Sequence, residues 1–183
     1  AKNHATTVFY GDEEAVNGGF ESALSEHASN DDTWTGDTED ASQNAEIAAV
    51  ASNARTGSKA VSITLEDTSG YITYNKTDYT VGRTYRAEGW FKKSGTITAF
   101  QMFADTTIRG EGTAGAAITP STSYQKAYVD FVATATTMMI NFKITGTSTH
   151  YGFLDDFSIK EVGTATGWTD ADQQLDIPQT ALQ

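Results

Sequence analysis

The segment 84–92 constrains the fold more than any other part of this sequence, because its side chains alternate between two types. One set is small or apolar and fits against a second sheet: Tyr85, Ala87, Gly89 and Phe91. The other set combines charged groups with one large ring: Arg86, Glu88, Trp90 and Lys92. A period of two residues predicts a β-strand with one buried face and one available face. We therefore expect 84–92 to be the central strand of the protein.

The charged face of this segment differs from an ordinary solvated surface. Trp90 offers a large flat ring, and Arg86 and Glu88 lie on the same face of the strand. A ring flanked by hydrogen-bonding groups suits an uncharged, hydroxyl-rich ligand such as a sugar, because the ring covers the apolar C–H face and the polar groups pair with hydroxyls. Alternatively, Trp90 fills a gap under a loop and the charges belong to an exposed edge. The sequence leaves both interpretations open.

The rest of the chain repeats the pattern of short β-prone runs between turn residues. Seven further runs fit strands: 45–51, 59–65, 71–75, 96–105, 124–133, 137–145 and 151–162. The connections are rich in glycine, threonine and serine, and the 183 residues include only two prolines. This pattern predicts an all-β protein in which two antiparallel sheets form a sandwich. We expect a single domain over 16–162, a lead-in over 1–15 and a connector over 163–183.

The charge and the amino-acid usage exclude several classes of function. Acidic residues outnumber basic residues by 24 to 12, which gives a formal charge of −12. That charge argues against nucleic-acid binding, and no apolar run approaches the ~20 residues of a membrane span. The chain has no cysteine, and its three histidines lack the spacing of a zinc hydrolase. We therefore expect a soluble, secreted or particle-surface protein that neither binds nucleic acid nor inserts into a membrane.

Further outward positions extend the polar and aromatic surface that begins at Trp90. Alternation in the next runs points to an outward set of polar, flat or apolar side chains: Gln101, Phe103, Lys126, Tyr128, Asp130, Met139, Asn141 and Lys143. If these runs lie beside 84–92, the outward residues form one continuous face with Trp90. The alternative is the solvated side that antiparallel sheets commonly have.

Two other features require a specific partner. Trp34 lies in the polar segment 22–44, so it either closes over the core as a lid or lines the end of a ligand cleft. Asp155 and Asp156 interrupt an apolar run, where two carboxylates cost free energy unless they are paired or bound to a metal.

Five motifs in this order resemble one family. They are N-G-G-F-E at 17–21, G-S-K-A at 57–60, G-x-T-Y-x-x-x-x-W at 82–90, Y-Q-K-A-Y-V-D-F at 124–131 and F-L-D-D-F-S-I-K at 153–160. Together they resemble the galactose-binding-like jelly-roll carbohydrate-binding modules of the family 4/9/22 type, over about residues 16–162. The resemblance implies a non-catalytic module that binds a poly- or oligosaccharide on a concave sheet face.

The resemblance also implies site residues. Structural calcium would be held by Glu21, by Asp155 or Asp156, and by a main-chain carbonyl near Lys59; such hard oxygens are the ligands that calcium prefers. The alternative is that Glu21 and Asp155 cap turns by accepting hydrogen bonds from backbone amides. The implied sugar platform is Trp90, with Trp34 closing one end of the cleft. The implied polar or stacking neighbours of the platform are Arg86, Glu88, Gln101, Tyr128 and Asn141.

The flanks of the module carry a second resemblance. The segments 3–13 and 163–183 are similar to those that bracket such modules in tailed-phage structural proteins. This implies an extracellular or virion-associated location, further domains in a longer polypeptide and contact with a host surface glycan. It also leaves open a purely structural or adhesion domain of a virion, without sugar affinity.

An enzyme on the same scaffold is the third alternative. Glu88 and Asp130 are the outward carboxylates that neighbouring strands could bring together, as a glycoside hydrolase requires. Nothing in the sequence places either of them in an apolar pocket that would raise its pKa. We therefore expect a protein that is not an enzyme.

Overall fold

The computed structural model describes residues 8–22, 34–36 and 45–164, and these form eleven strands and no helix. The strands are β1 (Val8–Tyr10), β2 (Trp34–Gly36), β3 (Ala45–Val50), β4 (Ala60–Leu65), β5 (Ser69–Lys76), β6 (Thr84–Ser94), β7 (Ile97–Asp105), β8 (Thr113–Ala114), β9 (Gln125–Val132), β10 (Met138–Gly146) and β11 (Tyr151–Thr164). The predicted all-β architecture is thus confirmed. None of the described segments is a helix long and apolar enough to cross a membrane.

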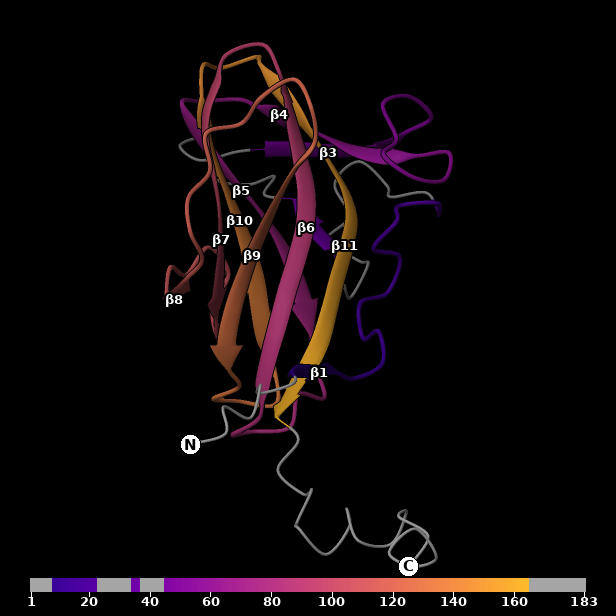
Figure 1. The fold of residues 1–183 in the computed structure, drawn as a ribbon. Coiled ribbons are helices and arrows are strands. Elements are labelled where there is room, and N and C mark those ends of the chain that lie inside the picture. Colours follow the sequence, from indigo (N-terminus) through magenta and orange to yellow (C-terminus); the bar gives the residue numbers. More distant parts are fainter. Residues whose placement is uncertain (1–7, 23–33, 37–44, 165–183) are drawn as a thin grey trace, which may run out of the picture.

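The strands form two sheets that face each other (Figure 1). The first, which we call the β6 sheet, has the order β3-β4-β11-β6-β9, with β1 added to β11. The second, the β10 sheet, has the order β2-β5-β10-β7-β8. From β4 onward the chain passes repeatedly from one sheet to the other, and the paired strands are antiparallel. The fold is the predicted two-sheet antiparallel sandwich with a jelly-roll path.

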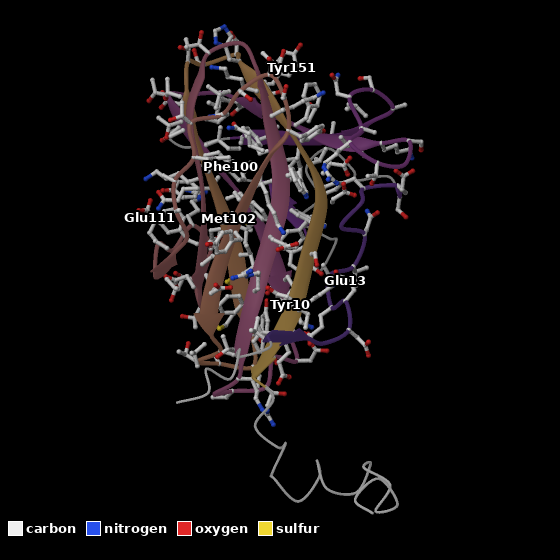
Figure 2. The ribbon with its side chains drawn as sticks, viewed as in Figure 1. Tyr10, Glu13, Phe100, Met102, Glu111 and Tyr151 are labelled. Atoms are coloured by element: carbon white, nitrogen blue, oxygen red, sulfur yellow. The ribbon has the colours of Figure 1, made fainter. Side chains whose placement is uncertain are left out.

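The core follows from the alternation in each strand. The apolar set of β6 is buried and its charged set is partly exposed, as predicted for 84–92. Phe91 of β6 and Phe100 of β7 stack across the two sheets, with ring centroids 4.2 Å apart and planes inclined by 8°. Figure 2 shows Phe100 and Met102 inside the sandwich, where both are fully buried. Burial of such rings is the main force that holds the sheets together.

Trp34 belongs to this core. Its side chain is fully buried. It packs against four aromatic rings, those of Phe20, Tyr74, Phe142 and Phe157. Of the two roles left open for Trp34, closure over the core is therefore right and the end of a ligand cleft is wrong. The short strand β2, which pairs with β5, carries this ring into the sandwich although the surrounding sequence is polar.

The sandwich extends beyond the boundaries predicted at 16 and 162. Strand β1 pairs with the end of β11, from Val8 opposite Thr164 to Tyr10 opposite Val162. The chain then continues along β11, where the Gly11 amide donates to the Glu161 carbonyl at 2.9 Å. Residues 1–7 and 165–183, which include most of the predicted connectors, lie outside the described part of the chain.

The consecutive aspartates form a β-bulge in β11. Asp155 lies opposite Trp90 of β6, but the next paired residue is Ser158, opposite Glu88. One extra residue is therefore inserted, and Asp156 adopts a φ of 48°. The extra residue lets Leu154 and Phe157 both point into the core. After Asp155 and Asp156, the positions of β11 that face the core are therefore shifted by one residue.

Candidate functional site

The predicted sugar contacts lie on two different faces of the molecule. Arg86, Glu88 and Trp90 of β6 and Tyr128 of β9 share the outer face of the β6 sheet. Gln101 of β7 and Asn141 of β10 belong to the β10 sheet. The prediction of one continuous face is therefore wrong. Alternation distinguishes inward from outward residues, but it does not say which sheet a strand joins.

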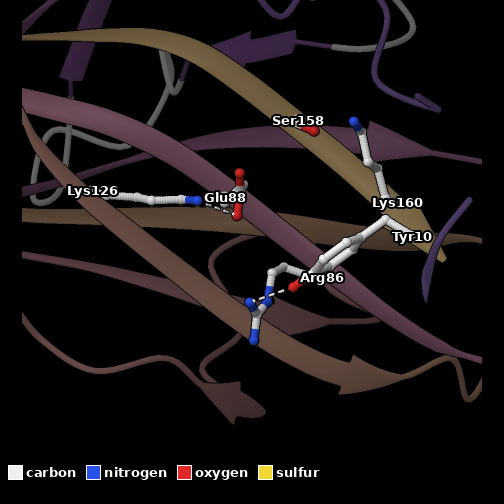
Figure 3. Close-up of a pocket in the computed structure, with 6 residues that line it drawn as sticks. All are labelled: Tyr10, Arg86, Glu88, Lys126, Ser158 and Lys160. Carbon is white, nitrogen blue, oxygen red and sulfur yellow. Dashed lines mark hydrogen bonds and ion pairs between the residues drawn. The ribbon is translucent and has the colours of Figure 1, made fainter. Parts of the chain in front are cut away.

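The outer face of the β6 sheet contains a small pocket at Arg86 (Figure 3). Its volume is about 160 Å³, and its lining comes from four strands: Tyr10, Arg86, Glu88, Lys126, Ser158 and Lys160. Arg86 forms a bidentate ion pair with Asp130, with both N···O distances at 2.6 Å. This carboxylate raises the pKa of the Arg86 guanidinium. Arg86 Nη1 also donates to the Tyr10 hydroxyl at 2.8 Å, so its orientation is fixed.

Two exposed tyrosine rings flank this guanidinium. Tyr128 is 45 % exposed, and its ring centroid lies 4.5 Å from the Arg86 guanidinium carbon. Tyr10 is 49 % exposed, and its centroid lies 5.7 Å away. The rings retain accessible surface while the cation fixes their positions. Such half-exposed rings beside hydrogen-bonding groups can stack on an apolar ligand face.

Carboxylates pair with the lysines of the pocket. Glu88 Oε2 lies 2.7 Å from Lys126 Nζ, and Glu13 Oε2 lies 3.9 Å from Lys160 Nζ. Glu13 also accepts a hydrogen bond from the Ser158 hydroxyl. The pocket therefore combines several ion pairs with little net charge, although the whole chain is acidic.

Trp90 is less accessible than we expected. The Arg55 guanidinium carbon lies 3.8 Å from the centroid of the Trp90 ring, so it covers one of its faces. Arg55 is held there by an ion pair to Asp156, at 2.5 Å. A ligand that stacks on this face must displace Arg55. The interpretation that Trp90 lies under a loop therefore fits this geometry.

The loop that carries Arg55 connects β3 to β4, and we call residues 53–59 the strap. Tyr124 donates its hydroxyl hydrogen to the Asn53 carbonyl at 2.7 Å, and Lys92 Nζ donates to Asn53 Oδ1 at 3.0 Å. Gly57 has a φ of +63°, and a Cβ there would lie 2.2 Å from Glu21 Oε1. Glycine is therefore required where the strap passes this carboxylate.

Glu21, one of the predicted metal ligands, holds the strap through hydrogen bonds. Glu21 Oε1 accepts from the amides of Ser58, at 2.8 Å, and Lys59, at 3.0 Å. The hydroxyl of Ser58, followed by these amides, lowers the pKa of Glu21. The Lys59 ammonium donates to the Glu21 carbonyl at 2.9 Å.

The carboxylate of Asp155 also holds the strap by accepting hydrogen bonds from its amides. It is fully buried, and its Oδ2 accepts from the amides of Arg55, at 2.6 Å, and Thr56, at 3.2 Å. Its Oδ1 accepts from the Asp156 amide at 2.8 Å. Burial raises the pKa of Asp155. The Thr56 hydroxyl donates to Asp156.

These contacts bear on the predicted calcium. The oxygens of Glu21 and Asp155 face N–H donors, which is the capping role left open as the alternative. Within the described ranges, no three acidic or histidine side chains converge on one point. A calcium ion at this edge would therefore need main-chain carbonyls beside the two carboxylates. Calcium binding stays a prediction.

Asn141 has a structural role on the outer side of the β10 sheet. It is fully buried, and its Oδ1 accepts from the Thr73 hydroxyl at 2.7 Å and the Arg109 amide at 3.0 Å. Its Nδ2 donates to the carbonyls of Thr107, at 3.0 Å, and Gly110, at 2.9 Å. The amide thus makes four hydrogen bonds, which is its usual capacity. Asn141 is an anchor for the loop 106–112, and the prediction that it contacts a sugar is wrong in this structure.

The same loop covers aromatic side chains of the β10 sheet. Tyr71 and Phe103 are each only 4 % exposed. The Tyr71 hydroxyl donates to Glu111, which also pairs with Lys143 at 2.6 Å. The predicted contact Gln101 donates to the carbonyl of Gly115, directly after β8, at 2.9 Å, so it holds the chain beyond this loop.

Sequence reasoning missed part of the pocket on the β6 sheet. The alternation in F-S-I-K could have identified Ser158 and Lys160 as outward residues. Lys126 was recognised as outward but not as part of a site. No local signal identifies Tyr10, because its place beside Arg86 depends on the pairing of β1 with the far end of the chain.

Comparison with solved structures shows which proteins share this architecture. The sequence matches no protein-family model and no curated protein. Among solved structures, a family 61 carbohydrate-binding module in complex with β-1,4-galactotriose is similar with a TM-score of 0.58 and 17% identity, over 81% of this chain and 97% of that chain. The xylan-binding domain CBM22-1 of Paenibacillus barcinonensis Xyn10C is similar with a TM-score of 0.55 and 16% identity, over 79% and 97%.

A phage protein contains a similar sandwich. The enzymatically active domain of tailspike protein 4 from bacteriophage CBA120 aligns with a TM-score of 0.51 and 16% identity, over 81% of this chain and 21% of that chain. These identities establish the fold alone. The chain has the jelly-roll fold of carbohydrate-binding modules, as its motifs predicted.

Proposed function

We propose that this protein is a non-catalytic module that binds a neutral poly- or oligosaccharide on the outer face of the β6 sheet. The observation that carries the proposal is the pair of half-exposed rings, Tyr10 and Tyr128, that both lie against Arg86 beside the pocket. Solved modules of the same fold in complex with galactotriose, or described as xylan-binding, support the choice of a sugar. Residues Arg86, Glu88 and Tyr128 are the proposed contacts, with Trp90 available when Arg55 shifts.

The chemistry of the face agrees with an uncharged ligand. Its cations are paired with carboxylates, so hydroxyl groups find both donors and acceptors in fixed positions. A polyanion would meet little uncompensated positive charge there and would be repelled by a chain of formal charge −12. Neutral glycans such as xylans, galactans and β-glucans are therefore the proposed ligand class.

The carboxylates on this face support a binding role over catalysis. Asp130 is held by both branches of Arg86, and Glu88 is paired with Lys126. A general acid needs a carboxyl group that is free to reach the glycosidic oxygen, whereas both of these carboxylates are engaged by cations. Neither residue is suited to protonate a glycosidic oxygen.

A second candidate is an adhesion or structural domain of a virion without sugar affinity. A similar sandwich in a phage tailspike protein supports the virion context of this candidate. Both candidates place the module in a longer extracellular or virion-associated protein. They differ in whether the isolated chain binds glycans.

The test is calorimetric titration of the full chain against soluble xylan, β-1,4-galactan, β-glucan, mannan and alginate. We expect micromolar-to-millimolar binding of a neutral polymer and at least a tenfold loss in Tyr128→Ala. Tyr71→Ala, on the other sheet, is the matched control and should leave the affinity within about twofold. Loss of binding in Tyr71→Ala alone would move the site to the β10 sheet. Failure of every polymer to bind the folded protein would favour the virion domain.

A further inference from the structure

The shape of the pocket at Arg86 limits what part of a glycan it can hold. Its volume is about 160 Å³. Cavities that enclose a larger ligand are commonly ~300–1,000 Å³. The pocket therefore has room for a single sugar ring.

Paired side chains border the pocket, and Figure 3 shows two of these pairs, Glu88 with Lys126 and Arg86 with Tyr10. The Glu88–Lys126 ion pair lies on the side toward Trp90, where Arg55 covers the ring. On the side of β9 lies the Arg86–Asp130 pair. An interior residue of an extended chain needs an open path on both sides, and the Glu88–Lys126 pair occupies the path toward Trp90.

Beside Ser158 and Lys160 of β11, the N-terminal part of the chain forms another wall. Tyr10 of β1 lies against Arg86, and Glu13 is held beside β11 through the Ser158 hydroxyl and the Ile159 amide. Figure 2 shows Tyr10 and Glu13 along β11. The segment 8–15 therefore completes a site that the rest of the sandwich leaves open.

We propose that this pocket receives the terminal residue of a neutral glycan chain, and that the rest of the chain extends into solvent. This inference rests on the proposed function, and it specifies that the protein recognises the terminal residue of the glycan. A non-reducing end carries a free hydroxyl where an interior residue has a glycosidic oxygen. The ammonium groups of Lys126 and Lys160 have further N–H donors, and Glu88 and Glu13 offer acceptors for that hydroxyl. A site built around such a hydroxyl discriminates strongly against ligands that lack it.

The experiment titrates the full chain with xylan, β-1,4-galactan and β-glucan oligosaccharides of two to six units. Terminal recognition predicts dissociation constants within about twofold across the series that binds. Tyr10→Ala should weaken every member at least tenfold, and Tyr10→Phe, which removes only the hydroxyl, about threefold. Tyr71→Phe is the matched control on the other sheet and should change nothing. Thermal melting confirms that each variant is folded.

Each outcome has a definite meaning. Affinity that rises tenfold or more from two to six units would show recognition of a chain interior and overturn the inference, while the proposed function would stand. Length-independent binding that Tyr10→Ala and a second pocket variant, Lys160→Gln, both leave unchanged would place the terminal site elsewhere and also overturn it. If no oligosaccharide and no polymer binds, the proposed function falls and the inference falls with it.

Discussion

The outer faces of the two sheets arrange similar side chains in different ways. On the β6 sheet, cations lie over aromatic rings, and the strap covers Trp90 while Tyr10 and Tyr128 stay half exposed. On the β10 sheet, the loop 106–112 is anchored on Asn141, and Tyr71 and Phe103 are buried. The first face offers rings to a ligand without rearrangement, whereas the second must move a loop to do so. This contrast is the reason for placing the proposed site on the β6 sheet.

The largest effect is expected from Asn141→Ala on the β10 sheet. The substitution removes four hydrogen bonds and leaves buried partners such as the Thr73 hydroxyl unpaired. We expect a loss of about 2–4 kcal/mol in the free energy of unfolding, measured in urea. Amide exchange should accelerate at 107–110. Gln101→Ala, which removes one bond to Gly115 beyond β8 on the same sheet, is the control and should cost about 1 kcal/mol. An equal loss in both variants would show that Asn141 is not the anchor.

If Glu21 and Asp155 bind calcium, the ion should stabilise the folded protein at the strap side of the β6 sheet. An ion at one hundred times its dissociation constant stabilises the folded state by about 2.7 kcal/mol. For a domain of this size the melting temperature should rise by roughly 5–10 °C. Glu21→Gln should abolish the shift, and Glu111→Gln, on the other sheet, should keep it. An identical melting temperature in calcium and in chelator would leave the carboxylates with their capping role alone.

Arg55→Ala tests whether the strap restricts Trp90. The contact between guanidinium and ring contributes about 0.5–2 kcal/mol, so the variant should be less stable by that amount. Quenching of tryptophan fluorescence by acrylamide should increase, and the increase should be absent in a Trp90→Phe background. If Trp90 also contacts the glycan, the variant should bind more tightly. Unchanged quenching would mean that the ring stays covered without Arg55.

The smallest effect on stability is expected from the loss of the Glu111–Lys143 ion pair on the outer face of the β10 sheet. The hydrogen bond from Lys143, and then that from Tyr71, lowers the pKa of Glu111 below its ordinary value of 4.5. Its stabilisation is therefore present above the unfolded-state pKa and is lost as the pH falls through the folded-state pKa. Relative to Glu111→Gln, we expect the native protein to be more stable by up to about 1 kcal/mol at pH 7. The difference should vanish in acid. A constant difference down to pH 2 would contradict the assignment.

Much of the local structure could be predicted from the sequence. The inward and outward sets of 84–92 were predicted correctly, because the alternation is strict. The same holds for the outward residues Lys126, Tyr128 and Asp130 in β9. Trp34 was harder, since the three-residue strand β2 carries it into the core from a polar segment, and only its aromatic neighbours explain its burial.

The sequence by itself determined most of the strands, their two faces and the class of fold, because these depend on local periodicity and turn residues. Only the tertiary structure decided which outward residues share a sheet. Gln101 and Asn141 were thereby separated from Arg86 and Trp90, and Tyr10 was brought beside Arg86. The physical reason is that strand order and loop cover arise from pairings between residues far apart in the chain, and no local pattern encodes those pairings.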